Sequence, residues 1–149
     1  MPNTGMVVVS DIVTKDDLHP KNKKDVGKRL ANWALSKTYG KEGIPFSGPL
    51  FRDIRIEGSI IRVIFDYVDN GLRCEGDHLT HFQIASRDKN FLDAKAEIRG
   101  NSVVVYSEEI EDPIAVRFAW SNSAIPNLFN AEGLPASCFR SDDWEIEME

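Results

Sequence analysis

The sequence predicts a mainly β protein, with an antiparallel β-sandwich over residues 44–149 that is preceded by one βα unit over residues 1–43. Three observations support this class. One amphipathic helical stretch occurs near the N-terminus, and no helical period recurs after residue 44. The remainder divides into six or seven short segments rich in β-branched and aromatic residues, with turn residues between them. A chain of 149 residues is long enough for one ordinary domain with a core.

The βα unit starts with MVVVS at residues 6–10, an apolar and β-branched run that is typical of a strand buried on both faces of a parallel sheet. A polar loop then leads to a helix that we expect over residues 20–39. Proline suits its first position, where no N–H is needed, and Val26, Leu30 and Trp33 recur along one face. A single βα unit cannot cover both faces of its strand, so this unit is expected to be the incomplete end of a larger α/β domain.

The remaining chain alternates apolar and polar residues in the manner of half-buried strands. Strands are expected at residues 50–58, 59–68, 79–85, 94–98, 102–107 and 114–120. Turn residues separate them at 57–59, 69–71, 99–101 and 111–113. Asn70 and Gly71 suit a type I′ hairpin, because both central residues of that turn need a positive φ. On the first strand, the alternation places Leu50, Ile54 and Ile56 on one face.

Composition and charge exclude several functions. The net charge is −6, and the one local basic run, from Lys21 to Arg29, follows a helix face without interleaved aromatics, so we expect no nucleic acid and no membrane as a partner. No apolar run is long enough to span a bilayer, and the first residues lack the features of a signal peptide. Cys74 and Cys138 are expected to be buried free thiols, although a single bridge is possible. The acidic residues 142–149 are expected to form a solvated tail.

The loop between the expected strand and helix holds the strongest candidate for catalysis. In open parallel α/β sheets functional groups lie just beyond the carboxyl ends of strands, and Asp11, Asp16, Asp17 and His19 occupy that position. A carboxylate that accepts the Nδ1–H of His19 would fix the tautomer and stabilise the imidazolium formed when Nε2 takes a proton. A tight turn could return either Asp16 or Asp17 to the ring. The alternative is structural, because aspartate and histidine are common at helix N-termini.

Two stretches carry a resemblance to a known family. DLHPKNKKDVGKRLANWAL begins at Asp17, and EGLPASCFRSDDW ends at Trp144. They resemble the end of the catalytic domain and the end of the C-terminal β domain in the sialate O-acetylesterase family, a branch of the SGNH (GDSL) hydrolases. The resemblance implies a serine esterase, commonly secreted or periplasmic, that removes acetyl groups from sugars without a cofactor. It implies His19 as the general base and Asp16 as the orienting acid, with Asp17 as an alternative and Asp11 as a weaker one.

The nucleophile that such an esterase requires is missing from this sequence. In the resembled family it lies in a GDS-type motif, followed by glycine and asparagine donors to the oxyanion. Neither GDS nor G-x-S-x-G occurs here, and the nearest stretch, FSGPL around Ser47, is expected to be an interdomain linker. We therefore expect the C-terminal part of a carbohydrate O-acetylesterase, inactive alone, whose partners are the missing N-terminal catalytic portion and an acetylated sugar. The alternative is a non-catalytic β-sandwich module that binds carbohydrate or another protein.

A histidine pair downstream has the composition of a metal site. His78 and His81 have Cys74, Glu75 and Asp77 nearby. Positions i and i+3 of a strand point to opposite faces, however, and no second group of ligands follows at a useful spacing. We therefore predict no metal.

Four aromatic residues near the C-terminus could form a platform on which a sugar stacks. They are Trp120, Phe129, Phe139 and Trp144. Aromatic residues in a long loop more often pack that loop against its own domain or a neighbour, which is the interpretation that we favour. Direct contact with a sugar is the alternative.

Overall fold

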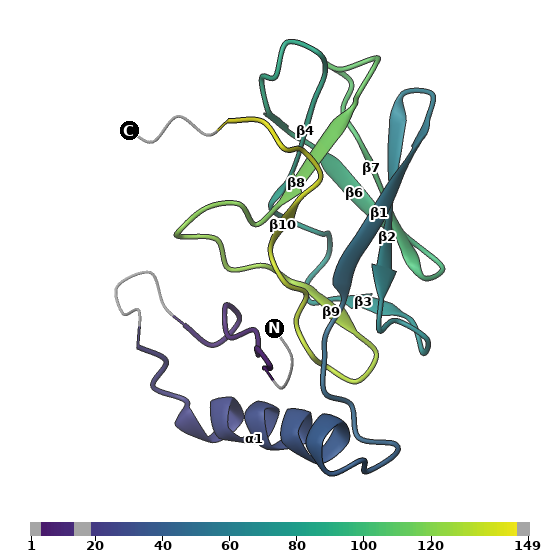
Figure 1. The fold of residues 1–149 in the computed structure, drawn as a ribbon. Helices are drawn as coiled ribbons and strands as arrows, with labels where there is room; N and C mark the ends of the chain where they lie inside the picture. The colour runs from purple at the N-terminus through teal and green to yellow at the C-terminus, as the bar shows by residue number, and fades with distance from the viewer. Residues whose placement is uncertain (1–3, 14–18, 146–149) are drawn as a thin grey trace.

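The computed structural model describes residues 4–13 and 19–145, and it confirms the mainly β class with antiparallel sheets. One helix, α1 (Lys23–Trp33), lies beside a β domain that is formed by the later part of the chain (Figure 1). The N-terminal residues run between this helix and the β domain. Within the described ranges, the helices are too short and too polar to span a bilayer.

Helix α1 begins one residue after Asn22, which is three residues later than expected. The side-chain oxygen of Asn22 accepts a hydrogen bond from the Asp25 N–H at 3.2 Å and so caps the first turn. The helix continues as a π-helical stretch, η1 (Ala34–Thr38), and Gly40 then adopts a positive φ beyond its end. No residue of either stretch is buried.

The β domain consists of two four-stranded antiparallel sheets and one two-stranded sheet. The first sheet has the order β1 (Leu50–Glu57), β2 (Ile60–Asp66), β7 (Ser102–Tyr106) and β6 (Lys95–Arg99). The second has the order β10 (Phe139–Arg140), β8 (Ala115–Phe118), β4 (Phe82–Ala85) and β5 (Leu92–Asp93). The small sheet pairs β3 (Leu72–Cys74) with β9 (Leu128–Asn130). Strands β3, β5, β9 and β10 were not expected, because two or three residues are too few to show an alternation.

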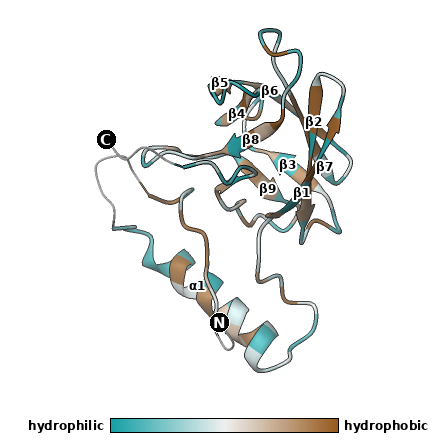
Figure 2. Ribbon diagram, turned by 45° about the horizontal axis from the view of Figure 1, so that its top comes forward, coloured by the Kyte–Doolittle hydropathy of each residue, from teal (hydrophilic) through white to brown (hydrophobic). Residues whose placement is uncertain are grey.

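One hydrophobic core joins the two larger sheets. Side chains of β2 and β7 meet those of β4 and β8, and the fully buried ones include Ile61, Val63, Val103, Val105, Phe82, Ile84, Val116 and Phe118. Along β2 every second residue is buried, which is the pattern of a strand with one face on the core. Hydrophobic residues gather on these strands in Figure 2, whereas α1 alternates hydrophobic and hydrophilic positions.

Strand β1 departs from the expected alternation. A bulge between Phe51 and Asp53 shifts its register against β2, so that Phe51 rather than Leu50 packs against the core together with Ile54. Ile56 lies next to the hairpin turn at the end of the strand and is 52% exposed. The prediction of one shared face was therefore wrong for Leu50, because a bulge cannot be read from the alternation. Ile54 and Ile56 keep a regular register against β2 and do share a face.

Two of the predicted turns form hairpins and a third does not. Gly58 and Gly100 each open a two-residue loop with φ of +65° and +62°, and these loops connect β1 to β2 and β6 to β7. At residues 69–71 the type I′ prediction is wrong, because Gly71 has a positive φ and Asn70 does not. This turn leads from β2 to β3, and β3 pairs with β9, so the flanking strands are not neighbours.

Residues 6–10 do not form the expected strand. They have no regular secondary structure, and they pair with no strand among the described residues. A strand of a parallel sheet requires hydrogen-bonding neighbours, and the described part of the chain offers none beside this segment. The segment lies between α1 and the β domain instead (Figure 1).

Candidate functional site in the N-terminal region

His19, the predicted general base, lies in the loop that leads into α1 and is exposed. The two predicted orienting acids, Asp16 and Asp17, lie outside the described residues. An exposed imidazole can be reached by a substrate or by another polypeptide, and it is the side chain best suited to exchange a proton at neutral pH. The position of His19 is therefore compatible with proton transfer to a group that approaches the loop.

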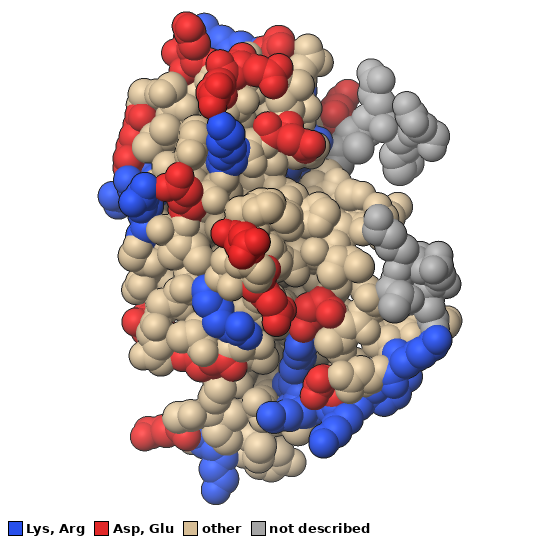
Figure 3. Space-filling model, turned by 180° about the vertical axis from the view of Figure 1, so that it is seen from behind, with Lys and Arg blue, Asp and Glu red and all other residues tan. Residues whose placement is uncertain are grey.

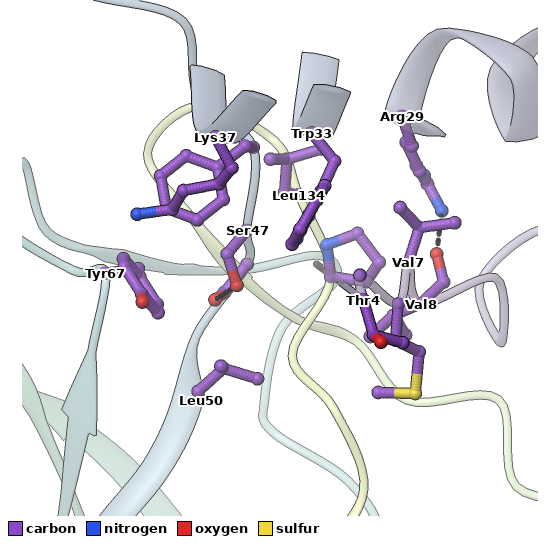
Figure 4. Close-up of a pocket in the computed structure, with 15 residues that line it drawn as sticks. Thr4, Val7, Val8, Arg29, Trp33, Lys37, Ser47, Leu50, Tyr67 and Leu134 are labelled. Atoms are coloured by element: carbon purple, nitrogen blue, oxygen red, sulfur yellow. Dashed lines mark hydrogen bonds between the residues drawn. The ribbon is translucent and has the colours of Figure 1, made fainter. Parts of the chain in front are cut away.

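Asp11 has a structural partner. Its carboxylate accepts two hydrogen bonds from the guanidinium of Arg29, at 2.7 and 2.6 Å, and only 12% and 11% of the two side chains are exposed. Arg29 also donates to the carbonyl of Val8 at 2.7 Å (Figure 4). The hydrogen bond to Asp11 raises the pKa of Arg29, as expected for a cation next to a carboxylate. Asp11 thus ties the N-terminal segment to α1, which argues against it as the acid that orients His19.

A cavity of about 220 Å³ lies between this N-terminal region and the β domain (Figure 4). Its apolar lining comes from residues 6–8 and Trp33 on one side and from Leu50 and Leu134 on the other. The indole of Trp33 lies against Gly5, where a larger side chain would collide with the ring. The cavity therefore marks the seam along which the N-terminal region meets the β domain.

Ser47, the serine in the stretch closest to a nucleophile motif, lines the same cavity. Its hydroxyl donates to the carbonyl of Gly48 at 2.9 Å, and no histidine is found among the described residues around the cavity. A serine hydroxyl without a base within reach is a weak nucleophile. Ser47 is thus a linker residue in this structure.

The pair His78 and His81 does not gather a ligand set. Within the described part of the chain, no three histidine, cysteine, aspartate or glutamate side chains are placed to hold a metal ion. Cys74 is half-buried, and burial raises the pKa of its thiol. Cys138 is exposed, which corrects the prediction of a buried thiol, because it precedes the inward-facing Phe139 and the strand alternates. Both thiols are free.

The structure separates the four C-terminal aromatics. Phe129 and Phe139 belong to short strands and are 4% and 6% exposed, so they are core residues. Trp144 is half-buried, with its ring 5.6 Å from that of Phe91. Trp120 is 41% exposed and is the one member of the four that is available for contact with a ligand.

The prediction of a solvated acidic tail was wrong for Asp142, whose side chain is buried. Its carboxylate accepts two hydrogen bonds from Arg117 of β8, at 2.9 and 2.8 Å, and its side chain is 0% exposed. The hydrogen bonds from Arg117 lower the pKa of Asp142, and the same contact raises the pKa of Arg117. The sequence offers no local signal for this pair, because the two residues are 25 positions apart. The neighbouring acidic residues made the segment resemble a tail.

The fold and site define a class: a mainly β domain that carries an N-terminal helix and an exposed histidine just before it. No known protein-family profile matches the sequence. Over 130 residues the chain is 27% identical to the sialate O-acetylesterase of Mus musculus, and the match covers 81% of this chain and 24% of that relative. The sialate O-acetylesterase of Homo sapiens is 37% identical over 60 residues, which cover 38% of this chain and 12% of the relative.

A solved structure gives a similar result. The fold matches the crystal structure of a carbohydrate acetylesterase from Xanthomonas citri with a TM-score of 0.84 and 38% sequence identity, covering 90% of this chain and 31% of that chain. The chain is therefore related to the sialate O-acetylesterases and to this carbohydrate acetylesterase. It spans less than a third of the length of each of these relatives.

Proposed function

We propose that this chain is the C-terminal part of a carbohydrate O-acetylesterase and that it supplies the general-base histidine of a Ser-His-Asp site. The observation that carries the proposal is the similarity to the Xanthomonas citri carbohydrate acetylesterase, at 38% identity over 90% of this chain. The serine and the oxyanion donors would come from polypeptide outside this sequence, because no GDS or G-x-S-x-G motif occurs within it. The substrate would be an acetylated sugar.

In this mechanism Nε2 of His19 takes the proton of the serine hydroxyl as the serine oxygen attacks the acetyl carbonyl. When the tetrahedral intermediate collapses, the sugar oxygen leaves with that proton and the acetyl group stays on the serine. A water molecule, deprotonated by the same imidazole, then attacks the acetyl-serine, releases acetate and restores the serine. Asp16 or Asp17 would accept the Nδ1–H and hold the ring in the required tautomer.

Contacts in the N-terminal region support this role. Arg29 joins the segment before the histidine loop to α1, so the two ends of that loop are held in a fixed relation. Leu30 of α1 and Tyr39, which follows η1, are 48% and 71% exposed, which suits contact with further α/β structure. We infer that residues 1–43 complete an SGNH-type α/β domain, in which residues 6–10 pair as a strand once neighbouring strands are present. Residues 44–149 form the separate β domain.

A chimaera tests the proposal. This chain replaces the matching part of the Xanthomonas citri enzyme, and hydrolysis of an aryl acetate is measured. We expect the chimaera to be active and His19→Ala to lower its kcat at least about a thousandfold, because the serine then loses its base. His78→Ala is the control, because His78 is also exposed but lies far from His19 in the sequence. This substitution should change kcat less than about twofold.

The same chimaera decides between the two acids. Asp16→Asn and Asp17→Asn are compared, and the orienting acid is the one whose loss lowers kcat by orders of magnitude. A chimaera that folds but is inactive would overturn the general-base role. A His19→Ala chimaera that is as active as the unsubstituted chimaera would overturn it as well.

A second candidate function is a non-catalytic module for carbohydrate or protein binding. The β domain favours it, because the core lies within that domain and Trp120 stands on its surface. Saccharide binding by the chain, combined with an active His19→Ala chimaera, would establish this function instead.

A further inference from the structure

We propose that the loop between β8 and β9 forms a carbohydrate-stacking subsite, with Trp120 as the platform for a pyranose ring of the saccharide substrate. The inference rests on the proposed function for the chemical class of its ligand. It assigns part of the substrate contact to the β domain, whereas the catalytic chemistry is assigned to the region of His19.

The backbone places Trp120 on the surface. Ala119 adopts φ of +50°, which is uncommon for a residue with a side chain, and its N–H donates to the carbonyl of His81 at 2.9 Å. Phe118 and Ala119 are buried, at 0% and 8% exposed, so the strand remains anchored up to the residue before the tryptophan. The indole that follows is 41% exposed, and such a surface suits an apolar ligand face.

Arg140 of β10 supports one side of this platform. Its guanidinium lies over the indole of Trp120, with the central carbon 5.6 Å from the ring centre. The same guanidinium donates to the carbonyl of Trp144 at 3.0 Å and lies 3.8 Å from the carboxylate of Asp142. With these partners Arg140 is held in place. The ring is therefore partly ordered before a ligand arrives, which reduces the entropy lost on binding.

Polar side chains of the same loop complete the subsite. Ser121, Asn122 and Ser123 follow the tryptophan and are exposed, with the two serine hydroxyls 3.3 Å apart. Hydroxyl and amide groups both donate and accept hydrogen bonds, as sugar hydroxyls require, while the C–H face of a pyranose packs on an aromatic ring. The far end of the loop is fixed by Asn127, whose amide donates to two backbone carbonyls in the loop after β3.

The loop is placed where a substrate of the N-terminal site could reach it. Figures 1 and 2 both show it on the side of the molecule where α1 begins, and α1 begins four residues after His19. Residues 119–127 contain no charged side chain. In Figure 3 the lysines at the start of α1 form a blue patch. An uncharged aromatic and hydroxyl-rich loop favours the ring of a saccharide over a phosphate or a nucleic acid.

Nuclear magnetic resonance on this 149-residue chain tests the subsite. The sequence contains three tryptophans, so the indole N–H signals of the ¹⁵N-labelled protein report each ring separately. Xylohexaose, cellohexaose and sialyllactose are titrated in turn. We expect at least one of them to shift the Trp120 signal saturably and to leave that of Trp33 in place.

Variants attribute the binding to the ring. Isothermal titration calorimetry measures the affinity of each variant, because Trp120→Ala and Trp120→Phe lack the indole signal. Trp120→Ala should weaken binding about tenfold, and Trp120→Phe, which keeps an apolar face, should stay within about threefold. Tyr39→Ala is the control, because this side chain is 71% exposed on a different element and should leave binding unchanged. The inference is overturned when none of the saccharides shifts the Trp120 signal, or when Trp120→Ala binds as well as Tyr39→Ala.

The two proposals can fail separately. Binding to the chain requires no serine nucleophile, so loss of the Trp120 signal change leaves the His19→Ala result in the chimaera unaffected. Conversely, an inactive chimaera with normal saccharide binding removes the general-base role and retains the subsite.

Discussion

The helix region and the β domain of this chain are stabilised in different ways. The buried apolar side chains of the described chain belong to the β domain, from Pro49 onward, whereas α1 and η1 bury none. The helix is held by the bidentate contact of Arg29 with Asp11 and by the packing of Trp33 on Gly5. The difference indicates that the β domain depends on a shared apolar core, while the N-terminal region depends on a few specific contacts.

The largest effect is expected in the core. Phe118 is 0% exposed and packs against Phe82 with ring centroids 4.5 Å apart. Phe118→Ala should lower the free energy of unfolding of the β domain by about 4 kcal/mol, because it removes a large buried ring and leaves a cavity. Urea unfolding followed by circular dichroism measures the change.

The matched substitution on the helix is Leu30→Ala. Leu30 is 48% exposed, so its truncation should change the free energy of unfolding by less than about 0.5 kcal/mol. If Leu30→Ala and Phe118→Ala lowered the free energy of unfolding equally, the helix region would share the core of the β domain. The two regions would then not be stabilised in different ways.

The second effect concerns the buried ion pair at the C-terminal end of the β domain. Asp142→Asn should destabilise the β domain by about 3 kcal/mol, because the guanidinium of Arg117, 17% exposed, is left without a compensating charge. Asp143→Asn is the control, since Asp143 is exposed and its neutralisation should have little effect. Unfolding midpoints in urea compare the two variants. Similar midpoints would mean that the pair contributes nothing.

The ion pair also predicts a dependence on pH. The hydrogen bonds from Arg117 lower the pKa of Asp142 below its unfolded value of about 3.9. A carboxyl with a lowered pKa adds stability that is complete above the unfolded pKa and is lost as the pH falls through the folded pKa. The difference in unfolding free energy between the wild type and Asp142→Asn should therefore be constant from pH 7 to pH 5 and shrink below about pH 4.

Sequence patterns predicted the long elements of the fold but not the short ones. Six strands of the β domain and the helix follow from alternation and from helical periodicity, because these patterns repeat over enough residues to be recognised. Strand β10, by contrast, exists because Phe139 and Arg140 pair with Phe118 and Arg117. Such pairing depends on tertiary contacts between distant segments, and no local pattern reports it.

The sequence selected candidate residues, but their contacts depend on tertiary structure. The spacing and the resemblance selected His19, which is exposed and whose role as general base stays a prediction. They also left Asp11 as a weaker acid, and its contact with Arg29, 18 residues away, could not be seen in the sequence. Trp120 and Phe139 both belong to one aromatic-rich stretch, and only their burial distinguishes a surface platform from a core residue.

The third effect is local to the N-terminal region. Arg29→Ala removes the hydrogen bonds to Asp11 and Val8, so residues 6–12 should separate from α1 at a cost of about 2 kcal/mol. Hydrogen exchange should then increase in α1 but stay unchanged in the strands of the β domain. Lys28→Ala is the control, because its side chain is exposed on the same helix. Faster exchange across the β domain would contradict the separation of the two regions.

The smallest effect is a stabilisation confined to the helix. Gly27 lies within α1, and a Cβ atom there would meet no other atom within 4 Å, so Gly27→Ala should stabilise the helix by about 0.7 kcal/mol. At Gly58 the space is equally open but φ is +65°, and Gly58→Ala should destabilise the β domain by about 1 kcal/mol. Hydrogen exchange in α1 measures the first change and urea unfolding the second. Gly27→Ala should leave the urea midpoint of the β domain unchanged. A raised midpoint would show that the helix and the β domain unfold together, because a local stabilisation of the helix affects the β domain only if the two regions unfold cooperatively.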